Sequence, residues 1–488
     1  MSAAKNKKPE TGSSKRNKIL GTIAAILVVL LIAGSFLINS DYFYTKTAAV
    51  SIGSTDYTTA EFNYFYRTAY NQFYSQLGDY ASMIIDSSKP LDEQYYVEGQ
   101  SYHDYFTEAA LTQMTEVTVA YDNAVAKGLS LSEENKTAIA DEMANVDIYA
   151  SIYGLSADKY LAQIYGSGMD KATLESIMNR VYLASQFYST EVESYSYTEE
   201  ELKAAYAEGK DDYDIFTYRV FYVPNNDDAE AAYADADAIA NAKDGEEFAQ
   251  LVREHASEDS ASSYADDDST LYTSAGANLG GYDYGDWLKE AGRKDNETTV
   301  MESSSGEGYY VVMFVGRDSN DYNTRSMRHI LIEVEEDDND GYTQENIDAA
   351  KAKIDEIKAA FDATDKTEES FANLANEKSE DPGSNTNGGL YEHIARNQMV
   401  QPVNDFVFAD DRKSGDTGIV YYEGDNYAGY HLIYFVGEGE PYCDYIADNS
   451  LRSADYSEWI ESQKANYPVE QHFSMRFVET NFSMNIAG

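Results

Sequence analysis

A repeat in the second half of the chain constrains its fold more than any other feature of the sequence. The first unit contains YRVFYV (218–223), FAQLVREHASED (248–259) and GYYVVMFVG (308–316). The second unit contains MRHILI (327–332), FANLANEKSED (371–381) and GYHLIYFVG (429–437). Self-similarity at this spacing indicates one supersecondary unit used twice. Each unit has the pattern of a strand, helices, a loop and a strand, so the sequence predicts two copies of an α+β domain.

Apolar periodicity in the second unit supports this interpretation. Residues that recur every three or four positions predict a helix there: Ile347, Ala350, Ile354, Ile357 and Phe361. Residues that alternate predict a half-buried strand: Ile330, Ile332 and Val334.

The segment from 48 to about 210 is predicted to be mostly helical. Thr58 with Glu61, and Thr198 with Glu201, have the spacing of capping boxes that begin helices. A helix over Tyr102 and the residues after it should end near Gly128. A further helical stripe consists of Leu174, Ile177, Val181, Ala184 and Tyr188.

The end of the chain is predicted to return to this helical segment. After Pro441, the pattern indicates a helix around 451–465 and a strand, HFSMRFV, at 472–478. We expect that strand to pair with the short apolar one near Ala48, so that both ends of the chain complete one domain.

The N-terminus carries an uncharged apolar run of twenty residues, ILGTIAAILVVLLIAGSFLI, at 19–38. At ~1.5 Å per residue this run is long enough to cross a ~30 Å hydrocarbon core as one helix. The basic residues before it predict that the N-terminus stays in the cytoplasm and that the bulk of the chain is extracytoplasmic. They are Lys5, Lys7, Lys8, Lys15, Arg16 and Lys18. A cleaved signal peptide is the alternative, although the run is longer than the roughly 7 to 15 residues usual for one.

Composition excludes several classes of partner and site. The chain has 36 Lys and Arg against 86 Asp and Glu, a net charge of −50, so nucleic acid is a poor partner. The single cysteine, Cys443, excludes an internal disulfide and a Cys-rich zinc site. The remaining histidines lack ligand spacing, so we predict no metal and no cofactor. A lone cysteine also agrees with the surface of a Gram-positive cell.

The second unit resembles the parvulin (PpiC) family of peptidyl-prolyl cis/trans isomerases. The resemblance rests on RHILI, FANLANEKSEDPGSNTNGGLY, QMVQPVNDFVF and GYHLIYFV, which occur in the family's order between Ser326 and Gly437. The segment before the repeat, with AEF near Glu61 and LESIMNR, resembles the chaperone domain of the PrsA and SurA foldases. These resemblances imply four-stranded antiparallel sheets with helices. The implied segments are a basic tail (1–18), a transmembrane helix (19–38), a chaperone domain (45–210), a degenerate parvulin-like domain (213–320), a parvulin domain (323–440) and a C-terminal segment (441–488) that packs on the chaperone domain.

The parvulin resemblance also implies an active site. His329 and His431 match the paired histidines that the family links by hydrogen bonds beneath the prolyl bond, and Asp381 matches the position beside the carbonyl. The implied pocket residues are Leu390, Met399, Val403 and Phe408, and Val403 stands where the family usually has Phe, which predicts a thinner wall. From the residues alone, alternatives stay open: the histidines and pocket residues as plain core, and Asp381 as a turn residue before Pro382.

The first unit lacks both histidines. Aligning the units puts Val220 opposite His329 and Tyr310 opposite His431, while Asp259 is retained. We therefore predict a parvulin fold without isomerase activity, retained for architecture or for peptide binding.

The function predicted from the sequence is that of a membrane-anchored foldase. Its partners would be unfolded or newly exported polypeptides with X-Pro bonds, and a homodimer stays open. The acidic loop at 333–341, EVEEDDNDG, predicts a preference for neutral or basic residues next to proline. One alternative is a non-catalytic holdase with parvulin scaffolds. Another, suggested by the acidic excess and the 44 tyrosines, is a structural surface protein.

Overall fold

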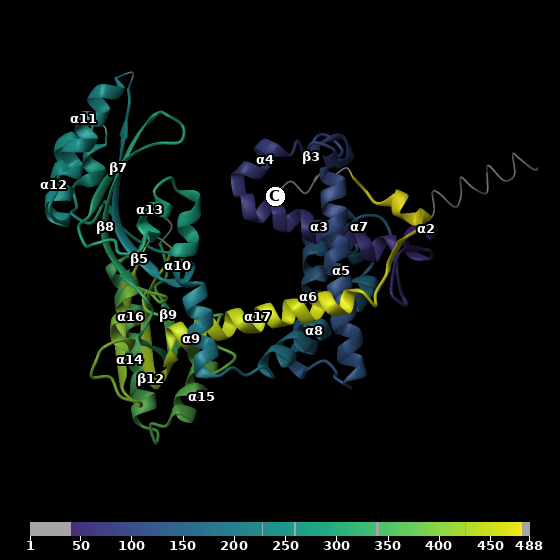
Figure 1. Cartoon of the computed structure of the whole chain (residues 1–488). Coiled ribbons are helices and arrows are strands. Elements are labelled where there is room, and N and C mark those ends of the chain that lie inside the picture. Colours follow the sequence, from purple (N-terminus) through teal and green to yellow (C-terminus); the bar gives the residue numbers. More distant parts are fainter. Residues whose placement is uncertain (1–40, 227, 258–259, 338–340, 425, 481–488) are drawn as a thin grey trace, which may run out of the picture. The chain divides into compact units, whose positions relative to one another are not determined.

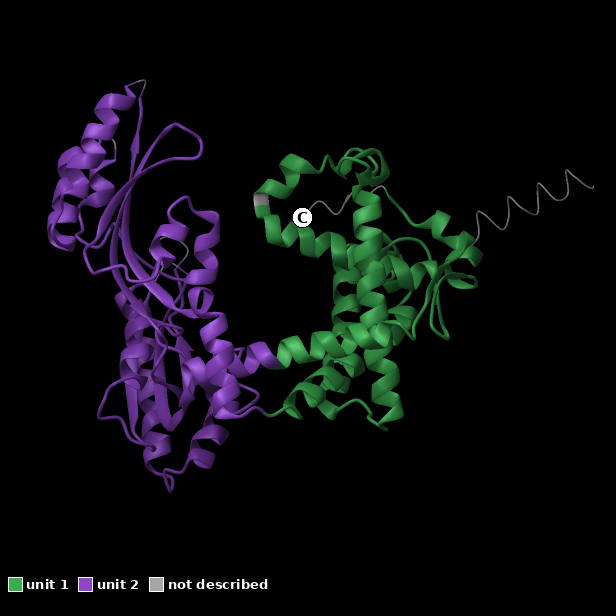
Figure 2. Cartoon of the chain, viewed as in Figure 1, with its two compact units in different colours: residues 1–196, 452–488 green, residues 197–451 purple. Residues whose placement is uncertain are grey.

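The computed structural model describes residues 41–480 except 227, 258–259, 338–340 and 425 (Figure 1). The chain divides into two compact units (Figure 2). We call Met1–Ser196 with Arg452–Gly488 the helical unit, and Tyr197–Leu451 the repeat unit. The predicted transmembrane segment, 19–38, lies outside the described residues. Within the described part, no helix has both the length and the apolar composition needed to span a bilayer.

The helical unit is built from long amphipathic helices and a small sheet. Its main helices are α3 (Thr59–Leu77), α5 (Tyr102–Ala126), α6 (Glu133–Ile152), α7 (Ala157–Tyr165) and α8 (Lys171–Glu193), with short α2 (Tyr42–Thr45) and α4 (Ala81–Ile84). Its strands are β1 (Ala48–Ile52), β2 (Thr55–Thr58), β3 (Tyr95–Val97), β4 (Gln100–Ser101) and β13 (Val469–Gln471). The sheet order is β13-β1-β2, and β3 and β4 form a separate hairpin.

The helices begin and end where the sequence predicts. Thr58 and Glu61 form a complete capping box at the start of α3. Gly128 follows α5 with a φ of +76°, a conformation that favours glycine at the end of a helix. The apolar faces meet in one core, where Phe62, Phe65 and Phe106 are almost fully buried.

The C-terminal strand prediction is right in its partner and wrong in its position. β13 pairs antiparallel with β1, with Val50 opposite Gln471, whereas Phe473–Phe477 form a 3-10 helix rather than a strand. The alternation of Phe473, Met475 and Phe477 resembles a strand pattern. It instead serves aromatic packing, because the Phe477 ring stacks on Phe43 at a centroid distance of 4.8 Å.

The repeat unit contains two four-stranded antiparallel sheets. The first has the order β6-β5-β8-β7, from β5 (Ile215–Pro224), β6 (Leu271–Ala275), β7 (Thr298–Glu302) and β8 (Gly308–Asp318). The second has the order β10-β9-β12-β11, from β9 (Asn323–Glu333), β10 (Leu390–Ile394), β11 (Thr417–Glu423) and β12 (Ala428–Pro441). The two orders are the same, which confirms the repeat.

Helices flank both sheets. The first set is α11 (Ala229–Ala240), α12 (Gly245–His255) and α13 (Gly285–Lys289), and the second is α14 (Gln344–Asp362), α15 (Glu368–Lys378) and α16 (Gln401–Val407). Before the first sheet come α9 (Glu199–Glu208), whose capping box at Thr198 is complete, and α10 (Lys210–Tyr213). The last helix, α17 (Tyr442–Lys464), begins earlier than predicted, and the boundary between the two units falls inside it.

The register of the central strands confirms the alignment of the two units. In the second sheet His329 lies opposite Ile433, and Leu331 lies opposite His431. In the first sheet Val220 lies opposite Val312, and Tyr222 lies opposite Tyr310. Val220 and Tyr310 therefore occupy the two histidine positions. Asp259, the aspartate that the first unit retains at the position of Asp381, lies outside the described residues. The exact domain boundaries stay predictions, although each sheet falls almost wholly within its predicted range.

Candidate active site

The two central strands of the second sheet present alternate residues to opposite faces. The side chains of Ile330, Ile332 and Leu432 pack under α14 and α15 in one apolar cluster. Met327 and Ile433, which alternate with them, belong to a second cluster that includes α16. His329 and His431 share the face of Met327 and Ile433, so the sheet separates them from α14 and α15.

The two histidines meet across adjacent strands. His329 Nδ1 and His431 Nδ1 are 3.3 Å apart, and the rings are stacked with an interplanar angle of 13°. Each residue is only 3% exposed. Sequence positions 102 residues apart thus form one hydrogen-bonded pair.

Asp381 extends this pair from the loop that follows α15. Its Oδ2 lies 2.8 Å from His329 Nε2 and accepts the hydroxyl of Tyr391 at 3.0 Å. Ser384 also donates its hydroxyl to Oδ2, and the Gly383 amide donates to Oδ1 at 3.1 Å. At the far end of the chain of contacts, the Tyr427 hydroxyl lies 3.3 Å from His431 Nε2.

These contacts are satisfied by one consistent assignment of protons. With Asp381 ionised, His329 donates from Nε2 to the carboxylate and leaves Nδ1 as an acceptor. His431 then donates from Nδ1 to His329, and its Nε2 accepts the Tyr427 hydroxyl. We assign these neutral tautomers because each ring nitrogen then has a partner of the opposite kind.

The pKa shifts agree with this assignment. Hydrogen bonding from His329, which is the largest cause, holds the pKa of Asp381 well below its usual range despite partial burial. Burial, which is the largest cause, lowers the pKa of His431 to about 4. Both effects favour an ionised Asp381 beside a neutral His431 at pH 7.

A pair of glycines lets the loop approach this strand closely. Gly388 and Gly389 both have positive φ, and a Cβ on Gly389 would lie 2.2 Å from the carbonyl oxygen of His329. The Gly389 carbonyl in turn accepts the His329 amide at 2.8 Å. Only glycine fits here, and it fixes the backbone of His329 against β10.

Residues 309–437 match the family model described as the PPIC-type PPIASE domain. This segment is a peptidyl-prolyl isomerase domain of the PPIC, or parvulin, type. The match begins in β8, the last strand of the first sheet, and runs to the end of the predicted GYHLIYFVG motif.

One solved structure is similar to part of this chain. The crystal structure of foldase protein PrsA from Streptococcus pneumoniae str. Canada MDR_19A is similar at 16% sequence identity, covering 45% of this chain and 77% of that chain, with a TM-score of 0.24. No curated protein matches this chain.

Two of the predicted pocket residues border the histidine face of the PPIC-type domain. Met399 and Phe408 are half-buried and pack against the cluster of Met327, Ile433 and their neighbours. They offer accessible apolar surface on the same side of the sheet as the histidines. Val403 lies in this cluster too and is fully buried, whereas Met399 and Phe408 keep part of their surface accessible.

Leu390, another predicted pocket residue, lies in β10. The strand register puts Leu390 opposite Arg328 and Tyr391 opposite Met327. Because paired residues of antiparallel strands share a face, Tyr391 and not Leu390 lies on the histidine side of the sheet. The register therefore puts Tyr391 on the histidine side, and the pocket role of Leu390 stays a prediction.

The sequence did not predict three hydroxyl groups of the hydrogen-bond network, those of Ser384, Tyr391 and Tyr427. Ser384 and Tyr391 both lie in the segment that carries the parvulin resemblance, but one hydroxyl among many gives no signal of a shared acceptor. Tyr427 stands four residues before His431, and in a strand that spacing puts two residues on one face. That spacing was the only available indication.

In the first sheet aromatic rings replace the polar network. Tyr310, at the position of His431, lies 5.0 Å from the Tyr222 ring and 5.4 Å from the Tyr284 ring. Tyr284 also contacts Tyr218, and both are almost fully buried. This side of the first sheet is therefore an aromatic core without the paired imidazoles.

Within the described ranges, no group of three or more His, Cys, Asp or Glu side chains is placed to hold a metal ion.

Proposed function

We propose that this chain is a membrane-anchored, extracytoplasmic foldase whose PPIC-type domain catalyses X-Pro isomerisation and whose helical unit holds unfolded clients. The observation that carries the catalytic part is the hydrogen-bonded series Tyr427, His431, His329 and Asp381, which lies beside the apolar surface of Met399 and Phe408.

The chemistry needs no proton transfer to the substrate. The X-Pro bond resists rotation with a barrier of about 18–20 kcal/mol because amide resonance places negative charge on the carbonyl oxygen. An ionised Asp381 beside that oxygen disfavours the charge-separated form and so lowers the double-bond character. The neutral histidines hold the carboxylate in place, while the proline ring lies against Met399 and Phe408. Such a site binds the twisted amide better than either planar form.

Exposed apolar surface on the helical unit supports the holding role. One patch around α4 and β3 contains Tyr80, Met83, Ile84, Tyr95, Tyr96 and Val97, all exposed. A second patch at the end of α6 contains Ile148, Tyr149, Ile152 and Tyr153. Exposed apolar side chains in such numbers are typical of surfaces that bind other proteins.

The anchor and the cell-surface location rest on the sequence. The uncharged run at 19–38 and the basic residues before it favour one helix with the N-terminus inside. The long acidic remainder would then face outward.

The test of the catalytic part uses the full chain in detergent and a proline-containing tetrapeptide. His431→Ala breaks the imidazole pair, and we expect kcat/KM to fall at least tenfold. The matched control is Tyr310→Ala, which truncates the equivalent position of the first sheet. The control should retain the wild-type rate, because the first sheet lacks the imidazole pair. Circular dichroism checks that both variants remain folded.

Two results would overturn the catalytic proposal. A wild-type chain that does not accelerate isomerisation, yet suppresses aggregation of an unfolded client, would establish the non-catalytic holdase instead. Equal losses in His431→Ala and Tyr310→Ala would show that the rate does not depend on the paired histidines.

A further inference from the structure

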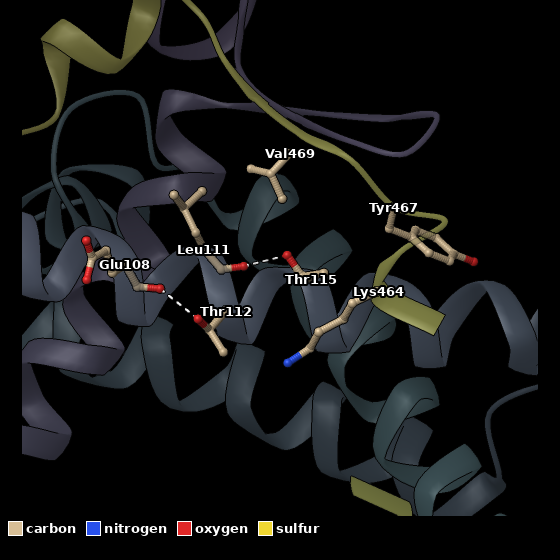
Figure 3. A pocket seen from close by; sticks show the side chains of 7 residues that line it. All are labelled: Glu108, Leu111, Thr112, Thr115, Lys464, Tyr467 and Val469. Atoms are coloured by element: carbon tan, nitrogen blue, oxygen red, sulfur yellow. Dashed lines mark hydrogen bonds between the residues drawn. The ribbon is translucent and has the colours of Figure 1, made fainter. Parts of the chain in front are cut away.

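A groove in the helical unit runs between α5 and β13. Its first part has a volume of 480 Å³ and is lined by four residues of α5 and three of the C-terminal segment (Figure 3). They are Glu108, Leu111, Thr112, Thr115, Lys464, Tyr467 and Val469. A second part, of 460 Å³, adjoins it, since Glu108 and Leu111 line both. It continues past His103 and Thr107 to Gln471 and Met475. Each part lies within the roughly 300–1,000 Å³ of ordinary ligand pockets.

One wall of this groove is the open edge of a sheet. Among the described residues, β13 pairs only with β1 and stands at the end of the order β13-β1-β2. The His472 amide donates to Ala49, and the Pro468 carbonyl accepts from Gly53. Because ladder bonds of antiparallel strands alternate, the backbone groups of Val469 and Gln471, between those positions, point away from β1.

The side chains at the same two positions face the groove. Val469 lies opposite Ile52, and Gln471 lies opposite Val50, so they share the sheet face that buries Val50 and Ile52 in the core. Yet 43% of Val469 is exposed. The core face of the sheet thus continues under β13 without a cover.

The two parts of the groove match the repeat of an extended chain. Val469 lines the first part and Gln471 the second, and residues two apart in a strand are separated by about 7 Å. A strand added beside β13 would place alternate side chains into the two parts. In the second part, the Thr107 hydroxyl is buried and has no hydrogen-bond partner among the described residues.

The charges around the groove favour one kind of occupant. Glu108 accepts a hydrogen bond from Gln100, and Asp104 accepts hydrogen bonds from the amide and the hydroxyl of Ser101. Neither carboxylate forms a salt bridge within the part of the chain that the structure describes. Lys464, the one lysine among the described residues that line the groove, is already paired with Glu116 and Glu461. The groove therefore presents net negative charge beside an apolar floor that includes Leu111.

We propose that this groove binds an extended client segment of alternating apolar and basic residues by strand addition to β13. Main-chain hydrogen bonds to Val469 and Gln471 give binding with little dependence on sequence, and the carboxylates select against acidic segments. The proposal rests on the holding role proposed above and locates client binding in the groove beside β13.

The test measures binding of a fluorescein-labelled peptide, GKVTVKVTG, to the full chain by fluorescence anisotropy. Gln471→Pro removes an amide that points outward, and so leaves the ladder with β1 intact. We expect it to raise Kd at least tenfold. Thr112→Trp, at an exposed position, should do the same by filling the groove. Glu470→Gln, on the other face of β13, should change Kd less than twofold. A peptide N-methylated at alternate residues should not bind, and tetrapeptide isomerisation should stay at the wild-type rate throughout.

Each contrary result has a distinct meaning. Wild-type affinity in both Gln471→Pro and Thr112→Trp, or equal binding of the N-methylated peptide, would overturn the groove while leaving the proposed function intact. A wild-type chain that neither binds the peptide nor suppresses client aggregation would remove the holding role as well. A change of sedimenting mass in Gln471→Pro would make a second copy of the chain the occupant. Peptide binding that appears only after removal of 481–488 would make the chain's own end the occupant, and either result overturns the proposal.

Discussion

Replacing Asp381 by Asn tests whether the ionised carboxylate organises the active site. The wild-type carboxylate accepts hydrogen bonds from four donors, on His329, Tyr391, Ser384 and Gly383. Asparagine keeps the shape but supplies one oxygen and one NH₂ group. We therefore expect the hydrogen bonds to survive in part, and the charge that strengthens them to be lost.

The size of the effect follows from these contacts. A hydrogen bond to a charged group contributes about 1.5–3 kcal/mol, whereas one between neutral groups contributes about 0.5–1.5 kcal/mol. The amide oxygen of Asn keeps the three hydrogen bonds that Oδ2 accepts, and each of them weakens by about 1 kcal/mol. The NH₂ group of Asn then faces the Gly383 amide, and because both groups are donors, this hydrogen bond is lost. Relief of the cost of burying a charge opposes both losses, because the Asp381 side chain is only 14% exposed. We expect a net destabilisation of about 3 kcal/mol.

Hydrogen exchange measures this locally. Amides of β9 and β12 should exchange more than 100-fold faster in Asp381→Asn, at about 1.4 kcal/mol per tenfold, while β5, β8 and α5 keep wild-type rates. The matched control is Asp355→Asn at an exposed position of α14. This variant loses only a surface ion pair with Lys351, which contributes less than about 1 kcal/mol. Less than a fivefold change in β9 and β12, or an equal change in β5 and β8, would refute the reasoning.

Two further predictions concern pH and the anchor. The pKa of His431 is about 4 in the folded domain, against an ordinary value of 6.5. Because the unfolded state takes up the proton at a higher pH, the free energy of unfolding should fall by up to about 3 kcal/mol as the pH drops from 6.5 to 4. Exchange rates of β12 amides measured across this range should show that loss in the wild type and much less of it in His431→Phe; greater wild-type stability at pH 4 than at pH 6.5 would contradict the sign. For the anchor, alkaline carbonate should leave the full chain in the membrane pellet, and protease added to intact Gram-positive cells should digest it; a chain that is extracted or protected contradicts the proposal.

Local chemistry explains what the sequence predicted correctly. The capping box at Thr58 and the stripe along α14 depend on residues within one or two turns, and such signals are readable without tertiary information. The paired histidines were found through the family's motifs. The first sheet's lack of them followed from aligning two copies of one unit, because the copies share strand order and register.

Tertiary contacts decide the features that local patterns in the sequence do not. Leu390 was assigned to the pocket, but the face of an edge strand depends on register, and the register of β10 shifts after Tyr391. Val403 stays a predicted pocket residue, and its complete burial depends on residues of β9 and β12 that are distant in sequence. The strand expected at 472–478 failed because its aromatic residues pack on Phe43 from the opposite end of the chain.

The pairing of β1 with β13 sets an order on biogenesis. More than four hundred residues separate Val50 from its partner Gln471, and the repeat unit lies wholly between them. As the chain emerges, both internal sheets can form before the segment that completes the helical unit has been synthesised. The edge of β1 that β13 covers thus stays without its partner until the last part of the chain has been synthesised, so the groove beside β13 is completed last.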